Sequence, residues 1–340
     1  MFYARTINMM ILDEKKESSL EGELREIADR LDVKTLGETF LFPKYFEIET
    51  YRGCNARCTM CTVNEWEDSN MRIKDGLFDK IADEMKGYAN WIERVTLSRD
   101  GEPLMDKFLS LRIKKLKDSG IRYVTFSTNG SLLNEKRASE LIDAGLDDIR
   151  FSVDGATKET FEAIRLRLNY EQVVGNYLKF IEMRDKGGKK PTIEVRMVVQ
   201  ERNKHEVDMW KEFWKPRIGH QDILYSKPMH SWGNQLKTYE LHHEDEIYAE
   251  KPCISPWSTM AIHANGKVGL CGCDYHTVVP MGNLNEQSVR EIWQSEPYQK
   301  ARQIHESGKR NDIKICVGCN IWDLGVRKIY HEGMLKSVLD

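Results

Sequence analysis

The chain has 340 residues, which is enough for a full-sized core and close to the length at which a chain divides into a large and a small domain. Its 51 Lys and Arg residues face 54 Asp and Glu residues, so the net charge of -3 gives no support for a nucleic-acid partner. The N-terminal apolar run meets acidic residues too early for a signal peptide, and no stretch approaches the roughly 18 apolar residues of a membrane span. We therefore expect a cytoplasmic protein with no membrane and no nucleic-acid partner.

Residues 1–41 are predicted to form an N-terminal extension with one packing helix. The segment "SSLEGELREIADRL" places its apolar residues at helical spacing, on one face. These residues are Leu20, Leu24, Ile27, Ala28 and Leu31.

From residue 46 onward, short β-branched runs alternate with longer stretches of helical periodicity. The runs predicted as strands are residues 46–51, 93–98, 121–127, 148–153, 192–199 and 222–226. The stretches predicted as helices are residues 77–88, 108–120, 134–145, 170–187 and 205–214. Strands separated by helices indicate a parallel sheet with right-handed crossovers. The predicted fold class is therefore α/β, with a partial (β/α)6 TIM-like barrel over residues 42–230.

A polar or Gly-rich motif follows each of the first four predicted strands. The motif "CNARCTMC", with Cys54, Cys58 and Cys61, follows the first strand, and "RDGEP", "TNGS" and "DGAT" follow the next three. In a barrel of this kind the carboxyl ends of the strands share one face, where the active site lies. The four motifs are therefore expected to meet at that face.

The eight cysteines are grouped as metal ligands are, which suits a reducing compartment where disulfides do not form. Cys54, Cys58 and Cys61 provide three thiolates with no nearby His, whereas structural zinc requires four closed ligands. A cubane iron–sulfur cluster held by three thiolates keeps one iron open to another molecule. The triad therefore favours a catalytic iron–sulfur cluster.

A small Cys-rich α+β domain is predicted over residues 253–322, after a linker at 231–252 and before a C-terminal tail at 323–340. A predicted hairpin turn, "ANGK", separates its first two thiols, and "CVGC" supplies the other two. The four thiols are those of Cys253, Cys271, Cys316 and Cys319. Together they would form a closed site, which suits zinc and an iron–sulfur cluster alike.

The spacing in "CNARCTMC" resembles the cluster motif of the radical S-adenosylmethionine (radical SAM) superfamily, and the resemblance extends over residues 42–322. It implies that a [4Fe–4S] cluster on the three cysteines binds S-adenosylmethionine (SAM) through its open iron. An electron from a reductant such as flavodoxin or ferredoxin would then cleave SAM, and the resulting 5′-deoxyadenosyl radical would abstract hydrogen from a substrate.

The same resemblance implies a set of SAM contacts. The segment "RDGEP" is similar to the Gly-Glu-Pro segment that receives the methionine amino group, although Asp100 stands where the family commonly has Gly. The motifs after the third and fourth strands would contact the ribose and the carboxylate, and the residue before the last cysteine of the triad would lie by the adenine. The residues expected to contact SAM are Met60, Gly101, Glu102, Asn129, Ser152 and Arg165.

The small domain resembles the twitch domain, a shortened relative of the SPASM domain that carries one auxiliary [4Fe–4S] cluster. Cys253, Gly266 with four residues between it and Cys271, and the Cys316-x2-Cys319 pair fit that pattern. The resemblance implies that these four cysteines hold the auxiliary cluster, which gives the chain a pair of [4Fe–4S] clusters.

Cys273 remains outside both ligand sets. It lies two residues beyond Cys271, so in a continuing strand the two side chains would share a face. A thiol there is expected to donate a hydrogen atom to a substrate radical, which produces epimerisation. The other interpretation is a buried free thiol or an alternative ligand to Cys271, with dehydrogenation as the outcome.

The expected activity is that of a radical SAM oxidoreductase or epimerase on a small, polar substrate that resembles a carbohydrate or an aminocyclitol. Modification of a ribosomally made peptide is the alternative, since similar enzymes with one auxiliary cluster include both classes. The non-enzyme alternative is a metal-stabilised scaffold or an electron-transfer protein.

Overall fold

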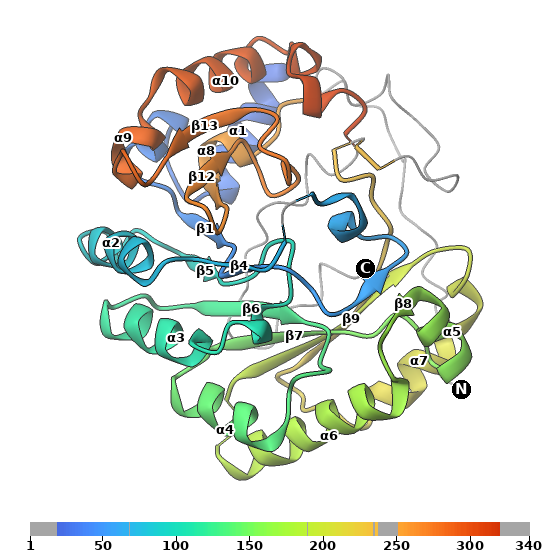
Figure 1. Ribbon diagram of the computed structural model, residues 1–340. Coiled ribbons are helices and arrows are strands. Elements are labelled where there is room, and N and C mark those ends of the chain that lie inside the picture. Colours follow the sequence, from blue (N-terminus) through green and yellow to red (C-terminus); the bar gives the residue numbers. More distant parts are fainter. Residues whose placement is uncertain (1–18, 68, 189, 234, 237–250, 320–340) are drawn as a thin grey trace, which may run out of the picture.

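The computed structural model describes residues 19–67, 69–188, 190–233, 235–236 and 251–319. Most of the predicted linker at 231–252 and the predicted tail at 323–340 lie outside the described residues. Within them, nine strands form one continuous sheet in the order β10-β9-β7-β6-β5-β1-β11-β12-β13 (Figure 1).

Six strands of this sheet are parallel and alternate with helices along the chain, which confirms the predicted partial (β/α)6 barrel. They are β1 (Tyr45–Ile48), β5 (Arg94–Thr96), β6 (Val124–Thr128), β7 (Asp148–Ser152), β9 (Thr192–Val199) and β10 (Ile223–Pro228). The helices between them are α2 (Asp75–Lys86), α3 (Leu109–Asp118), α4 (Glu135–Asp143), α5 (Lys158–Ile164), α6 (Tyr170–Lys186) and α7 (Val207–Trp214). Helix α5 is the one that the periodicity did not predict, because it is only two turns long.

The two faces of the barrel sheet differ in chemistry because successive side chains of a strand point to opposite sides. The face toward the helices is mainly apolar, and its residues Phe46, Val95, Phe126, Ile149 and Val195 are each at most 1% exposed. The inner face carries polar and charged residues instead, although barrel interiors are usually packed with branched apolar side chains. The barrel therefore has a polar interior.

The small unit continues the barrel sheet. Strand β11 (Thr259–Ile262) pairs in parallel with the free edge of β1, and β12 (Lys267–Gly269) and β13 (Pro280–Asn283) follow in antiparallel order. The β11–β12 hairpin confirms the predicted turn, where Gly266 has φ +87. Helices α8 (Ser255–Ser258), α9 (Val289–Trp293) and α10 (Glu296–Glu306) complete this unit. The boundary between the two predicted domains stays a prediction, because one continuous sheet runs through both of them.

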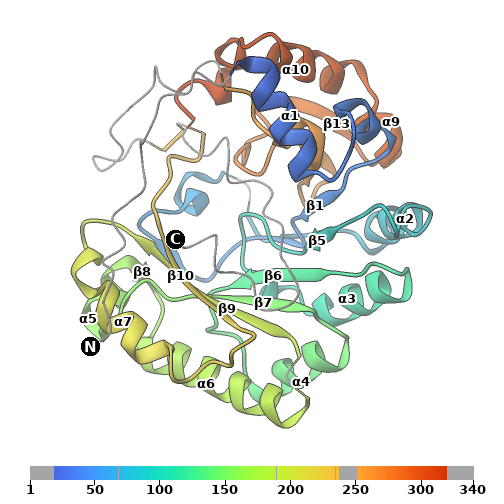
Figure 2. The ribbon, with the colours of Figure 1, turned by 180° about the vertical axis from the view of Figure 1, so that it is seen from behind.

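The predicted N-terminal helix is present as α1 (Leu20–Arg30), and Ser19 caps its first turn by accepting a hydrogen bond from the Gly22 amide at 3.2 Å. Its apolar face packs with Ile254 and Trp257 of the small unit, and both views place it there (Figures 1 and 2). The N-terminal segment therefore covers the C-terminal part of the chain.

Short elements complete the described structure. They are the strands β2 (Tyr51–Arg52), β3 (Arg57–Cys58), β4 (Met71–Arg72) and β8 (Arg165–Leu166), and the 3-10 helices η1 (Leu36–Leu41), η2 (Thr62–Glu65), η3 (Pro103–Met105), η4 (Lys204–Glu206), η5 (Arg310–Asp312) and η6 (Lys314–Cys316). No helix among the described residues combines the length and the apolar character needed to cross a bilayer.

A buried ion pair fastens α6 to the start of β10. Both Arg184 Nη atoms donate to the Asp222 carboxylate at 2.7 Å, and both side chains are fully buried. We expect Asp222→Ala to lower the free energy of unfolding by about 3 kcal/mol, because it removes the buried carboxylate partner of the Arg184 guanidinium and leaves only Asp185, which is 46% exposed. Anaerobic urea denaturation followed by circular dichroism measures this change.

The matched control is Asp208→Ala, which removes the same carboxylate where it is 96% exposed and 3.9 Å from Lys211. It should change the free energy of unfolding by no more than about 0.5 kcal/mol. Equal effects of the two substitutions would contradict a structural role for the Arg184–Asp222 pair.

Candidate active site

A cavity of about 410 Å³ opens at the carboxyl ends of the barrel strands and reaches the small unit. All predicted site residues except Cys316 line it, although they come from distant parts of the chain. Those that line it are Cys54, Cys58, Met60, Cys61, Gly101, Glu102, Asn129, Ser152, Arg165, Cys253, Cys271, Cys273 and Cys319. The structure therefore brings the two cysteine groups to one cavity, with the predicted SAM contacts beside the first group.

The loop that carries the first three cysteines is held by backbone pairing that the sequence did not reveal. Strand β3 pairs with β8, which sets Cys58 opposite Arg165, and the Thr59 amide donates to the Ile164 carbonyl at 3.0 Å. The Arg57 guanidinium donates to the Cys54 and Ala56 carbonyls, both at 2.7 Å. The thiols of the triad therefore project from a fixed turn.

The electrostatics of this turn suit a metal cluster. Burial raises the pKa of the Cys54 and Cys61 thiols to about 12, and the Glu102 carboxylate contributes to the rise at Cys54. Burial also raises the pKa of Cys58, which the neighbouring Arg165 partly offsets. Buried thiols of this kind ionise only when a nearby cation compensates the charge. Three such thiols in one turn fit the iron of a [4Fe–4S] cluster.

Glu102 is held rigidly next to the triad. Its carboxylate accepts hydrogen bonds from Thr128 Oγ1 and the Asn129 amide, both at 2.7 Å, and from the Leu104 amide at 3.1 Å. Burial raises its pKa, and these three donors oppose the rise. A carboxylate fixed in this way suits the predicted contact with the amino group of SAM.

The side chains predicted to meet the ribose and the carboxylate of SAM lie on neighbouring elements. Arg165 Nε donates to Asp154 Oδ2 at 2.7 Å, which holds the guanidinium beside Cys58. Ser152 Oγ accepts a hydrogen bond from Arg196 at 3.1 Å, and Asn129 Nδ2 donates to Asn55 Oδ1 at 3.0 Å. The Trp232 indole, which also lines the cavity, donates to the Met60 carbonyl at 3.3 Å.

The second cysteine group gathers at the edge of the small unit. Burial raises the pKa of Cys316, and the adjoining thiols of Cys271, Cys253 and Cys319 raise it further, so the four sulfurs lie close together. Burial likewise raises the pKa of Cys253 to about 11. These four thiols therefore match the predicted closed site.

His305 contacts two members of this group, and no sequence pattern predicted this contact. Its Nδ1 accepts from the Cys253 amide at 3.0 Å, so the ring proton lies on Nε2, which is 4.0 Å from Cys316 Sγ. Burial lowers the pKa of His305 to about 3, so the ring stays neutral. It thus donates toward the sulfur of Cys316, one of the predicted ligands.

The expectation that Cys273 continues a strand from Cys271 is wrong. Strand β12 ends at Gly269, and the chain then turns, with the Asp274 amide donating to the Cys271 carbonyl at 3.1 Å. The Asp274 carboxylate holds this turn by accepting from the Leu270, Val278 and Val279 amides. The two thiols nevertheless meet: a hydrogen bond with Cys271 and burial raise the pKa of Cys273.

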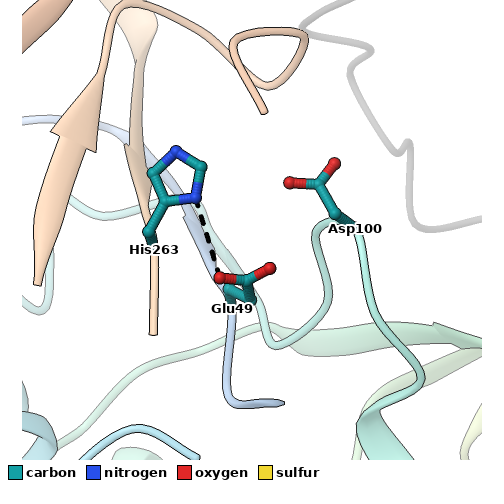
Figure 3. Close-up of side chains that lie close together, drawn as sticks. All are labelled: Glu49, Asp100 and His263. Atoms are coloured by element: carbon teal, nitrogen blue, oxygen red, sulfur yellow. Dashed lines mark ion pairs between the residues drawn. The ribbon is translucent and has the colours of Figure 1, made fainter. Parts of the chain in front are cut away.

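A buried polar cluster between the two cysteine groups was also missed (Figure 3). Glu49, Asp100 and His263 bring potential ligand atoms within 4.8 Å of one another. Arg99 donates to His263 Nε2 at 2.7 Å, so that nitrogen accepts and the ring presents Nδ1–H toward Glu49, 3.7 Å away. With both ring nitrogens engaged, this cluster is better described as a hydrogen-bonded network than as a metal site.

Cations on the inner face of the barrel are the other residues that the sequence analysis overlooked. Arg94, Arg150, Arg196 and Lys227 line the cavity from four different strands. Their signal was present in the strand sequences, where charged residues alternate with apolar ones, as in "TIEVRMVV".

Gly101 is required by the close approach of two backbone segments. A Cβ added there would lie 2.2 Å from the Tyr51 carbonyl oxygen and 2.7 Å from that of Gly53. We expect Gly101→Ala to displace the turn before Cys54 and to weaken SAM binding at least about tenfold. Anaerobic equilibrium dialysis with labelled SAM checks this.

Gly76→Ala is the matched control, because a Cβ there meets no described atom within 4 Å. Gly76 lies in α2, where Ala is the better helix former, so SAM affinity should not change. A Gly101→Ala protein with wild-type affinity would show that this close approach does not position the site.

The two cysteine groups should hold separate clusters, for about eight irons per chain. Reconstitution of a Cys54→Ala, Cys58→Ala, Cys61→Ala protein should leave about half of the iron and sulfide, measured by colorimetric analysis. Stoichiometric zinc in that protein would contradict an auxiliary cluster. Cys273→Ala should keep the full iron content, and a loss of half would make Cys273 a ligand.

Comparison with known families agrees with this geometry. Residues 48–213 match the model of the radical SAM superfamily, and residues 253–320 match that of the iron-sulfur cluster-binding SPASM domain. The two matches contain the first and the second cysteine group, respectively.

Two curated relatives align over most of the chain. The tungsten-containing aldehyde ferredoxin oxidoreductase cofactor-modifying protein of Pyrococcus furiosus is 25% identical, over 82% of this chain and 88% of its own length. The S-adenosyl-L-methionine-dependent 2-deoxy-scyllo-inosamine dehydrogenase of Niallia circulans is 21% identical, over 81% of this chain and 91% of its own length.

Solved structures share the fold. BtrN in complex with AdoMet and 2-DOIA matches with a TM-score of 0.57 and 17% identity, over 82% of this chain and 92% of its own. SuiB of Streptococcus suis, bound to its precursor peptide SuiA, matches with a TM-score of 0.64 and 12% identity, over 88% of this chain and 74% of its own. The expected cofactors, SAM and a pair of [4Fe–4S] clusters, agree with both family matches. The chain belongs to the radical SAM superfamily and carries a C-terminal SPASM-type iron–sulfur domain.

Proposed function

We propose that this enzyme abstracts hydrogen from a C–H bond of a small, polar substrate that resembles a carbohydrate or an aminocyclitol. The observation that carries the proposal is the position of the cavity, between the SAM-binding cysteines and the auxiliary cysteines, above a polar barrel interior. When bound, SAM and its cluster supply the 5′-deoxyadenosyl radical, and the auxiliary cluster supplies an electron acceptor. The likeness to an aminocyclitol dehydrogenase over most of both chains supports the substrate class.

The predicted site residues would have different binding roles within this cavity. Cys54, Cys58 and Cys61 would hold the SAM cluster, and the fixed carboxylate of Glu102 would orient the amino group of SAM. Asn129, Ser152 and Arg165 would orient the ribose and the carboxylate, with Met60 and Gly101 beside them. Cys253, Cys271, Cys316 and Cys319 would hold the auxiliary cluster at the other end. The reductant would be flavodoxin or ferredoxin in the cytoplasm, where thiols stay reduced.

The outcome depends on what the substrate radical meets next. In epimerisation it receives a hydrogen atom on its opposite face, and Cys273 is the buried thiol that lines the cavity beside Cys271. The thiyl radical left on Cys273 would return to the thiol by taking one electron from the reductant and one proton from solvent. In dehydrogenation it loses a proton and an electron instead. We favour epimerisation slightly, because a thiol that lines the cavity outside both predicted ligand sets has no other assigned task.

Turnover in deuterium oxide separates the two outcomes. The reconstituted protein is supplied with reductant, SAM and a panel of cyclitols and sugars with and without amino or acidic groups. Formation of 5′-deoxyadenosine above the substrate-free level identifies a substrate, and Cys58→Ala should abolish it. An epimerised product should carry one deuterium, because a thiol proton exchanges with solvent.

Cys273→Ala should still form 5′-deoxyadenosine but lose the inverted product. A product two hydrogens lighter than the substrate, unaffected by this substitution, would establish dehydrogenation. Response to a precursor peptide rather than to any cyclitol or sugar would favour the peptide class to which SuiB belongs. Absence of 5′-deoxyadenosine from the wild type under competent reduction would contradict radical SAM catalysis altogether.

A further inference from the structure

Cations from four strands gather on the inner face of the barrel, and their positions follow from the register. Arg94 lies on β5, Arg150 on β7, Arg196 on β9 and Lys227 on β10, and all line the cavity. Ser152 of β7 is opposite Arg196, and Val198 of β9 is opposite Lys227. The last two cations therefore lie near the carboxyl ends of adjacent strands, at the level of the predicted SAM site.

Arg150 already pairs with a carboxylate of the protein. Its guanidinium donates to Glu194, the residue opposite it on β9, and to Ser127 Oγ at 3.2 Å. Glu194 also accepts from the Tyr225 hydroxyl at 3.3 Å. The Glu194 carboxylate is thus already bound by Arg150 and Tyr225.

Arg196 makes no ion pair with a carboxylate in the described part of the chain. Its Nη2 donates to the neutral Ser152 hydroxyl at 3.1 Å, and its Nε is buried without a described hydrogen-bond partner. Burial lowers its pKa, and the positive charges of Arg150 and Arg165 lower it further, whereas Tyr225 and the Asp154 carboxylate act in the opposite direction. Burying a cation costs free energy unless an anion compensates its charge.

Lys227 and His230 complete the surroundings of Arg196. Burial lowers the pKa of His230 to about 3, and the positive charges of Lys227 and Arg196 contribute, which places the three groups together. His230 Nδ1 accepts from the Trp232 amide at 3.2 Å. The neutral ring therefore carries its proton on Nε2, and His230 lines the cavity as a donor.

The acidic residues of the cavity are engaged elsewhere. Glu47 lies against Gly272, where an added Cβ would be 2.2 Å from its Oε2. Asp100 lies 3.8 Å from Arg99 Nε, and Glu102 is held by Thr128 and Asn129. None of these three carboxylates forms an ion pair with Arg196 in the described part of the chain.

We propose that Arg196, Lys227 and His230 form a subsite for an anionic group, a phosphate or a carboxylate, that the substrate carries. The inference rests on the proposed function of the same cavity and narrows its substrate class. The planar guanidinium offers paired donors to two oxygens, the ammonium adds a point charge, and the imidazole adds a neutral N–H. An anion bound here would pair directly with the Arg196 guanidinium, whose described hydrogen bond goes to the neutral Ser152 hydroxyl and whose Nε has no described partner.

Titration calorimetry on the holoenzyme tests this, with both clusters reconstituted and SAM present. The probes are inorganic phosphate, myo-inositol 1-phosphate, glucuronate and neutral myo-inositol. We expect saturable binding of the anionic probes, with myo-inositol weaker by about tenfold or more. Arg196→Gln and Lys227→Met should each weaken anion binding by about tenfold to a hundredfold, as expected for a lost charged hydrogen bond. Tighter binding of the phosphate probes or of glucuronate identifies which anionic group the subsite prefers.

Arg122→Gln is the matched control, since it removes the same charge from a side chain that is 62% exposed and precedes β6 at the opposite end of the barrel. Its anion affinity should equal that of the wild type. Equal affinity of the wild type for myo-inositol and the anions overturns the proposal. So does a larger loss of SAM affinity than of anion affinity in Arg196→Gln, because the guanidinium would then serve the SAM carboxylate. Failure of the proposed function is separate: anions would bind, but no substrate would raise 5′-deoxyadenosine.

Discussion

Strand β1 pairs along both of its edges, with β5 on one side and β11 on the other, and the rest of the structure depends on this double pairing. Tyr45 is in register with Arg94 of the barrel and with Thr259 of the small unit. Backbone hydrogen bonds fix such a register, because a slip of one residue would turn every side chain to the wrong face. The two cysteine groups are therefore placed across one cavity by a continuous sheet rather than by a flexible hinge.

The barrel interior holds polar and charged side chains in place of a packed apolar core. The helix-facing side of the barrel sheet is mainly apolar, so the apolar core lies between sheet and helices, and the inner side carries mainly polar groups. Buried charges are tolerated where partners compensate them, as Glu194 compensates Arg150 and Asp154 compensates Arg165. Burial also raises the pKa of the Cys54, Cys58, Cys61, Cys253 and Cys316 thiols, which suits metal ligands rather than free nucleophiles.

The network around Arg99 connects the two ends of the cavity. Its guanidinium donates to His263 and to the Cys271 and Asp274 carbonyls, while the neighbouring Asp100 lies close to Glu49 and His263 (Figure 3). Burial raises the pKa of Asp100 to about 7, and Arg99 opposes that rise. The residue that stands where the family commonly has Gly is thus part of the support of the auxiliary cysteine turn. A change at Asp100 would act on both halves of the site.

Sequence by itself determined whatever is encoded locally. Strand and helix periodicities, the Cys54–Cys61 spacing and the "ANGK" turn each depend on neighbouring residues, so the barrel, the three-thiol site and the hairpin were predictable. The charged residues that alternate along β7 and β9 were equally visible, although they were not interpreted as a polar interior.

Only the tertiary structure decided what depends on contacts between distant segments. The pairing of β11 with β1, the pairing of β8 with β3, and the positions of His305 and Arg99 join residues with no local signal in common. The turn at Cys273 is of the same kind, because Asp274 caps amides on both sides of it and ends the strand that spacing alone would continue. Local patterns specify elements, whereas long-range pairing and buried charge compensation specify which elements share a site.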